Sequence, residues 1–180
     1  MITGLGSAKN LASGKKGAFY NMLEEFSKHW ERIDIICPRT KNYKLKTINY
    51  FGNVFVHISR WPLAFHPFWF LKMGLQIYKE QKFNLMTVHD FPPFYNGIGA
   101  RLLWSRLFAK KSRILDSQSE SGQNSRVPYI LEILHIPGYP RAANTKEWFY
   151  ARPLLWKLYW KFFGSKARAV RVMNQHQVPD

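Results

Sequence analysis

Short runs of apolar and β-branched residues alternate with longer segments of helical periodicity along the 180 residues of this chain. The short runs predict strands over 1–3, 32–37, 53–58, 84–90, 127–133 and 169–173. The longer segments predict helices over 17–30, 68–81, 96–107 and 146–163, the last with a break at Pro153. Strands that alternate with helices form parallel sheets with helices on both faces. The sequence therefore predicts a Rossmann-like, doubly wound α/β domain.

The charge of the chain restricts its partners. The formal net charge is +16 and 17% of the residues are aromatic, which favours nucleic acid, an acidic lipid surface or phosphorylated ligands. The basic residues are dispersed and no nucleic-acid recognition motif is present, so nucleic acid is the less favoured partner. No His, Asp or Glu cluster has metal-ligand spacing, so no metal site is expected.

Location is inferred from what the sequence lacks. No apolar run approaches 18 residues, so no membrane-spanning helix is expected. The start MITGLGSAK has no secretory pattern, and the single cysteine, Cys37, excludes an internal disulfide. A cytoplasmic location is expected. Peripheral attachment to the cytoplasmic face of the membrane is compatible with the same observations.

A glycine- and lysine-rich loop, GLGSAKNLASGKKG, occupies residues 4–17. It is not a P-loop, because Gly14 and Lys15 are followed by Lys16, and Lys9 interrupts the dinucleotide pattern G-x-G-x-x-G. In a doubly wound sheet with strand order 3-2-1-4-5-6, this loop faces the end of the fourth strand across the ligand crevice. The alternative is a simple turn with solvated lysines.

Five stretches carry a family resemblance through their order and spacing. They are MITGLGSAKNLASGKKGAFYNMLEEFSKHW, RIDIICPR, NLMTVHDFPPFYNGIGARLLWSRL, VPYILEILHIPGYP and AVRVMNQHQVPD. In these stretches the chain resembles the N-terminal domain of a family 4 glycosyltransferase of the GT-B fold. The resemblance covers residues 1–106 and 127–180. The rival hypothesis is a basic module without catalysis that binds a membrane surface or nucleic acid.

The resemblance implies the acceptor-side half of a retaining, metal-independent enzyme. Such an enzyme transfers a hexose from a nucleotide sugar to the hydroxyl of a glycan or lipid-linked acceptor. The nucleotide sugar is a co-substrate, held mainly by a second domain that these residues do not contain, and no other cofactor is implied. The isolated chain, one domain over 1–180, is expected to be catalytically incomplete.

The resemblance also implies site residues. The catalytic pair is His89 and Asp90. The loop that approaches the acceptor or the donor diphosphate contains Gly14, Lys15, Lys16 and Gly17. The residues expected to line the cleft are Glu132, His135 and Asn174. A carboxylate or imidazole at the end of the fourth strand can orient or deprotonate an acceptor hydroxyl. The alternatives are structural: Asp90 caps the next helix and Asn174 caps the end of a strand.

Two further segments stand out in composition. Residues 147–161 interleave aromatic and basic side chains, a pattern that suits a bilayer interface. The membrane-facing residues expected there are Trp148, Arg152, Trp156, Lys157, Trp160 and Lys161, which residues 60–61 and 65–70 could join. The alternative is a core-facing helix with a solvated basic face. Residues 110–126, rich in Ser, Gln and Lys and without periodicity, are expected to form a mobile loop.

Overall fold

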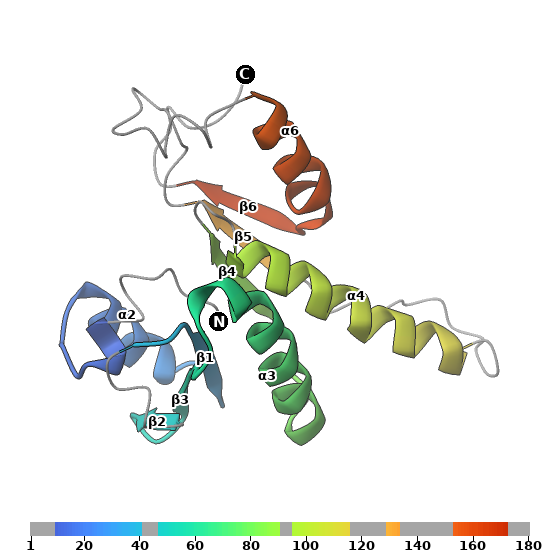
Figure 1. Ribbon diagram of the computed structural model, residues 1–180. Coiled ribbons are helices and arrows are strands. Elements are labelled where there is room, and N and C mark those ends of the chain that lie inside the picture. Colours follow the sequence, from blue (N-terminus) through green and yellow to red (C-terminus); the bar gives the residue numbers. More distant parts are fainter. Residues whose placement is uncertain (1–9, 41–46, 91–94, 116–128, 134–152, 173–180) are drawn as a thin grey trace.

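The computed structural model describes residues 10–40, 47–90, 95–115, 129–133 and 153–172 of an α/β protein (Figure 1). Its strands are β1 (Ile33–Cys37), β2 (Thr47–Tyr50), β3 (Val54–Ile58), β4 (Met86–Asp90), β5 (Tyr129–Ile133) and β6 (Ala169–Val172). Its helices are α2 (Ala18–Ser27), α3 (His66–Glu80), α4 (Tyr95–Leu115) and α6 (Pro153–Phe162), with 3₁₀ turns η1 (Leu63–Phe65) and η2 (Gly164–Lys166). Every predicted helix has a counterpart among these elements.

The described strands form two three-stranded sheets, in the orders β1-β3-β2 and β4-β5-β6. The second sheet is parallel, as is the pairing of β1 with β3, so the neighbours expected from the order 3-2-1-4-5-6 are observed wherever both strands are described. The strand expected over 1–3 lies outside the described residues.

The first sheet is mixed, which corrects the expectation of a purely parallel arrangement. Strand β2, absent from the sequence prediction, pairs antiparallel with β3 and places Thr47 opposite His57. The connecting turn places Phe51 (φ 56°) and Gly52 (φ 82°) in the left-handed region, and the Asn49 amide donates a hydrogen bond to the carbonyl of Gly52. The available signal in the sequence was the alternation of Ile48 and Tyr50 with the more polar Thr47 and Asn49.

Helices pack on both faces of β1. Ile35 lies in a buried cluster with Leu23 of α2 and Val56 of β3, while its neighbour Ile36 lies in a second cluster with Phe70 of α3. Successive side chains of a strand point to opposite faces, so the apolar run IDIIC supplies both clusters. This double burial explains why the strand is apolar almost throughout.

Helix α4 is longer than the sequence indicated. It continues to Leu115, so residues 110–115 of the expected mobile loop are helical, and residues 116–126 lie outside the described part. The segment contains good helix formers such as Lys111, Arg113 and Leu115. Their helix propensity explains why the helix continues here, although the segment has no apolar face with helical periodicity. The loop prediction is therefore wrong for its first six residues.

The crossing of α3 and α4 depends on glycine. A Cβ atom built on Gly99 would lie 2.7 Å from Cβ of Phe70, a group that cannot swing away. A Cβ on Gly74 would likewise meet the side chain of Leu103, although the end of a leucine side chain can move. Gly99 therefore allows the close approach of α4 to Phe70 of α3.

We expect Gly99→Ala to lower the free energy of unfolding by about 1–3 kcal/mol, because the added methyl group forces the two helices apart. Urea denaturation measures the change. Gly17→Ala is the control, since its Cβ would meet nothing within 4 Å; its expected cost is below about 1 kcal/mol. Equal losses in the two variants would contradict this account of the crossing.

Candidate site at the end of β4

The structure brings the start of α2 to the end of β4. The ring of Phe19, in the first turn of α2, lies 6.4 Å from the ring of His89 at an interplanar angle of 77°. His89 is buried and is followed by the last residue of β4, Asp90, whose side chain lies outside the described part. The first turn of α2, which follows the glycine-rich loop in the chain, therefore lies against His89.

The loop has more order than the sequence suggested. Residues 10–12 are helical, and this turn ends at Gly14, whose φ of 78° favours glycine. The Gly14 N–H donates to the carbonyl of Leu11 (2.9 Å) and the Lys15 N–H to that of Asn10 (3.0 Å). This pair of hydrogen bonds is a Schellman motif, which ends a helix and turns the chain. It directs residues 15–17 to the start of α2.

The start of α2 has the properties of an anion-binding end. Gly17 occupies the N-cap position in an extended conformation, and no side chain in the described part of the protein caps the helix with a hydrogen bond. The first-turn N–H groups of a helix carry a partial positive charge. Lys15 and Lys16 are exposed next to it, and the Lys16 ammonium lies 5.4 Å from the Tyr20 ring. The positive charge at this point therefore comes from both backbone and side chains.

A buried hydrogen-bond chain holds the end of β4 from behind. The Asn96 amide donates to the backbone carbonyl of His89 (2.8 Å), and its oxygen accepts from Nε2 of His66 at 3.1 Å. Burial lowers the pKa of His66 to about 4, so the ring is neutral and donates through Nε2. Neither His66 nor Asn96 is among the site residues that the sequence analysis selected. A polar residue at the start of an otherwise apolar helix was the available signal.

The predicted cleft residue Glu132 stands beside His89 in the sheet. It is the register partner of His89 in the parallel pairing of β4 with β5, and Ile133 is the partner of Asp90. The side chain of Glu132 lies outside the described part, as do His135 and Asn174. The backbone alone therefore brings two of the predicted site residues together.

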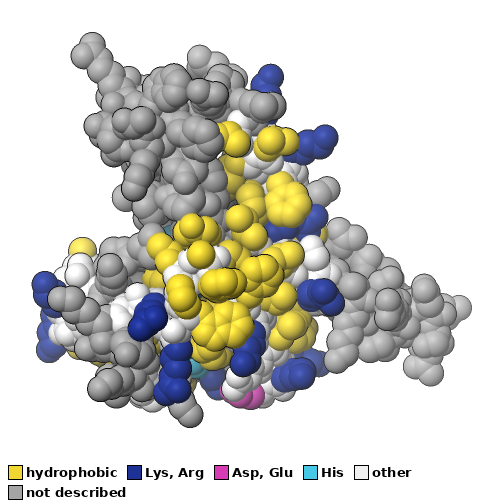
Figure 2. Space-filling model, in the orientation of Figure 1, with side chains coloured by type: hydrophobic (Ala, Val, Ile, Leu, Met, Phe, Trp, Pro, Cys, Tyr) yellow, Lys and Arg dark blue, Asp and Glu magenta, His cyan; other side chains and the backbone are white. Residues whose placement is uncertain are grey.

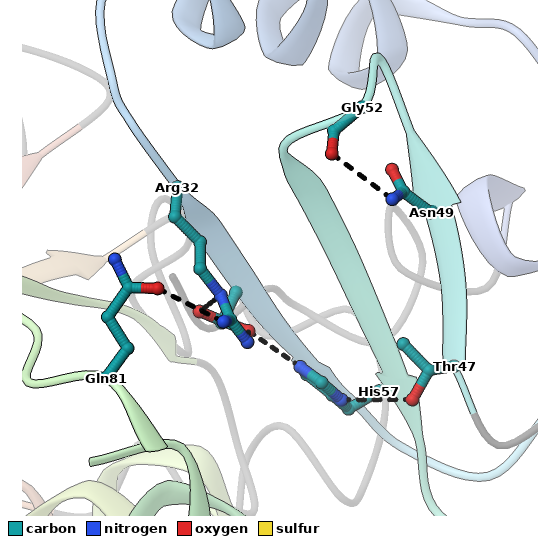
Figure 3. Close-up of polar contacts among 7 residues, drawn as sticks. Arg32, Thr47, Asn49, Gly52, His57 and Gln81 are labelled. Carbon is teal, nitrogen blue, oxygen red and sulfur yellow. Dashed lines mark hydrogen bonds and ion pairs between the residues drawn. The ribbon is translucent and has the colours of Figure 1, made fainter. Parts of the chain in front are cut away.

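A second polar cluster joins the three strands of the first sheet (Figure 3). Asp34 accepts two hydrogen bonds from Arg32, at 2.9 and 3.0 Å, and one from Nε2 of His57 at 2.8 Å. On the other side of the ring, Nδ1 accepts from the Thr47 hydroxyl at 3.2 Å, and Arg32 also donates to Gln81 at 3.1 Å. This cluster fixes β1, β2 and β3 in register.

The electrostatics of this cluster agree with a structural role. Burial raises the pKa of Asp34, but the hydrogen bonds from His57 and Arg32 outweigh it and place the pKa below its usual value. The guanidinium of Arg32 also lies 4.6 Å from the ring of Phe55. Sequence reasoning did not select this cluster. Its signal was a carboxylate inside a buried strand, which needs a partner.

An apolar cavity of about 350 Å³ lies between the beginnings of β1 and β4. Its lining includes Ile33, Ile36, Phe70, Met86 and Leu103. The cavity lies toward the amino ends of the two strands, and its described lining includes Thr87 but not His89. It is therefore distinct from the surroundings of His89.

The predicted membrane-facing helix is only partly described. Lys157, Trp160 and Lys161 of α6 are exposed, whereas Tyr159 and Phe163 are buried in the cluster with Phe70. Trp148, Arg152 and the side chain of Trp156 lie outside the described part. The described part of α6 therefore has an inner apolar face and an exposed basic and aromatic face, and its contact with a membrane stays a prediction.

No family model, curated protein or solved structure matches the chain. Among the described residues, no group of three or more His, Cys, Asp or Glu could hold a metal ion. Within the same residues, no helix is both long enough and apolar enough to cross a membrane.

Proposed function

We propose that this chain is the acceptor-side domain of a glycosyltransferase that moves a hexose from a nucleotide sugar to an acceptor hydroxyl. One observation carries the proposal: the start of α2, which no described side chain caps, lies beside Lys15 and Lys16 and meets the end of β4 at His89. The start of a helix can bind an anionic phosphate, and a histidine beside it can accept the proton of a hydroxyl group.

The proposal includes a finer statement of the fold. We propose that residues 1–3 form a strand between β1 and β4, which would join the two sheets into one Rossmann-like, doubly wound sheet. Two observations support it. β1 and β4 each stand at the end of their described sheet, and Ile36 of β1 and Val88 of β4 share a core cluster with Phe70. The glycine-rich loop would then follow the central strand directly.

The roles of the residues follow from their chemistry. His89 and Asp90 orient the acceptor hydroxyl or take its proton, and Glu132 stands in register with His89. The first turn of α2, with Lys15 and Lys16, binds a phosphate of the donor or of the acceptor. The donor sugar nucleotide is held mainly by a second domain. The retaining, metal-independent reaction is therefore proposed for the two domains together and not for this chain alone.

We expect this chain to bind UDP-glucose or GDP-mannose weakly and to turn neither over. The double substitution Lys15→Ala and Lys16→Ala should weaken that binding about two- to thirtyfold, since each exposed ion pair between a lysine and a phosphate contributes about 0.2–1 kcal/mol. Isothermal titration calorimetry at low salt measures the affinity.

The matched control replaces two exposed lysines far along the chain, Lys79 and Lys82, by alanine. Both double variants lose the same charge, so a general electrostatic effect would weaken binding equally in the two. That result would contradict a phosphate site at α2. Repeated turnover of the donor by the purified chain would contradict the assignment as one half of an enzyme.

A further inference from the structure

The segment that leads into α3 exposes four large apolar side chains within eight residues. Trp61, Leu63, Phe65 and Phe68 are between 37% and 55% exposed, while Phe70, two residues later, is fully buried. Figure 2 shows hydrophobic side chains gathered over the start of α3, with Lys and Arg side chains around them. Single exposed apolar residues are ordinary, but a contiguous apolar patch marks an interaction surface. We call these four residues the aromatic surface.

The backbone beneath the aromatic surface is held in place. The Trp61 N–H donates to the hydroxyl of the buried Ser59 at 3.1 Å, and the Phe65 N–H donates to the carbonyl of Pro62 at 2.9 Å. The next residue, His66, is buried and donates to Asn96. The rings are therefore presented outward from a fixed turn, so little conformational entropy is lost when they are covered.

The charged residues near the aromatic surface in sequence are all basic. Between Asp34 and Glu80 the sequence contains no acidic residue, whereas its basic residues there are Arg39, Lys41, Lys44, Lys46, Arg60, Lys72 and Lys79. Arg60 is exposed beside Trp61, and the Lys72 ammonium lies 5.8 Å from the ring of Trp61. Apolar rings next to cations match a surface that is itself apolar within and anionic outside.

We propose that the aromatic surface docks this protein onto an anionic lipid bilayer. The rings of Phe65 and Phe68 enter the boundary between headgroups and acyl chains, and Arg60 and Lys72 lie against acidic headgroups. This surface follows the carboxyl end of β3, and the chain His66–Asn96–His89 links it to the end of β4. That a lipid-linked acceptor enters from this side rests on the proposed function; the docking itself does not.

Vesicle flotation tests the proposal without donor or acceptor. The chain should float with vesicles of phosphatidylcholine and phosphatidylglycerol, and much less with phosphatidylcholine alone. Phe65→Ser with Phe68→Ser should reduce the partition coefficient about tenfold or more, since two half-exposed phenyl rings lose their apolar contact. Trp30→Ser, at an aromatic residue after α2 that is 47% exposed and belongs to neither the aromatic surface nor α6, is the matched control and should change it little. Circular dichroism verifies that each variant is folded.

The charged part of the surface has its own control. Lys72→Glu should weaken flotation several-fold, and Lys79→Glu, two helical turns or about 10 Å further along α3, should weaken it less. Equal flotation with neutral and anionic vesicles, or no loss in the double phenylalanine variant, would overturn the proposal. So would sedimentation velocity showing a dimer that the same double variant dissociates, because the surface would then bind a second copy.

Discussion

Phe70→Ala is expected to lower the free energy of unfolding by about 3–5 kcal/mol. Phe70 is completely buried, packs against Gly99 of α4 and stands edge-on to the ring of His66 at 6.5 Å. It also lines the cavity between β1 and β4, so the truncation enlarges a space that already exists. The surrounding helices cross too closely at Gly99 to collapse into it. Urea denaturation monitored by circular dichroism measures the loss.

Phe68→Ala provides the control for this prediction. The same ring is removed two residues earlier on the same helix, at a position that is 55% exposed. Its expected cost is below about 1 kcal/mol, as for most surface substitutions. Similar losses at the two positions would mean that the start of α3 is packed differently from the structure described here.

The second large effect is on the pH dependence of stability, through His66. Burial lowers the pKa of this ring to about 4 in the folded protein, whereas an unfolded chain has the ordinary value near 6.5. Between these values the unfolded state binds the proton and the folded state does not, so stability falls as the pH falls. The loss should approach about 3 kcal/mol by pH 4, at about 1.4 kcal/mol for each unit of pKa difference.

His66→Gln separates this contribution from other titrating groups. A glutamine amide can still donate to Asn96 but takes up no proton in this range. Stability measured from pH 7.5 to pH 4 should therefore fall more steeply in the unsubstituted protein than in the variant. Parallel curves for the two proteins would show that His66 is solvated or already charged.

The elements of this fold follow closely from local sequence. The strand IDIIC and the helix AFYNMLEEFS have contrasting apolar periodicities, and local sterics and burial are enough to separate them. The closeness of Gly99 to another element was also readable, because a glycine inside a helical pattern usually has a packing reason. Residues 110–115 and β2 were misjudged because helix propensity and hairpin pairing acted where the apolar pattern was weak.

The site depended on tertiary structure to a greater extent. Strand order predicted that the glycine-rich loop would approach His89, but the contact with Phe19 and the support from Asn96 come from elements that are distant in sequence. The Asp34–His57 pair spans 23 residues, and nothing in either local pattern names the other partner. Such pairs become visible only when the strands align in register.

The start of α3 shows most clearly what sequence alone could not decide. In HPFWFL nearly every residue is apolar or aromatic, so the periodicity has no contrast and cannot tell a buried ring from an exposed one. The structure buries His66 and Phe70 and exposes Phe68. Packing against α4 determines which residues are buried, because Asn96 accepts a hydrogen bond from His66 and Gly99 leaves space for the ring of Phe70. The identity of the residues determined that a helix forms here, and the packing of a second helix determined which of its faces is inside.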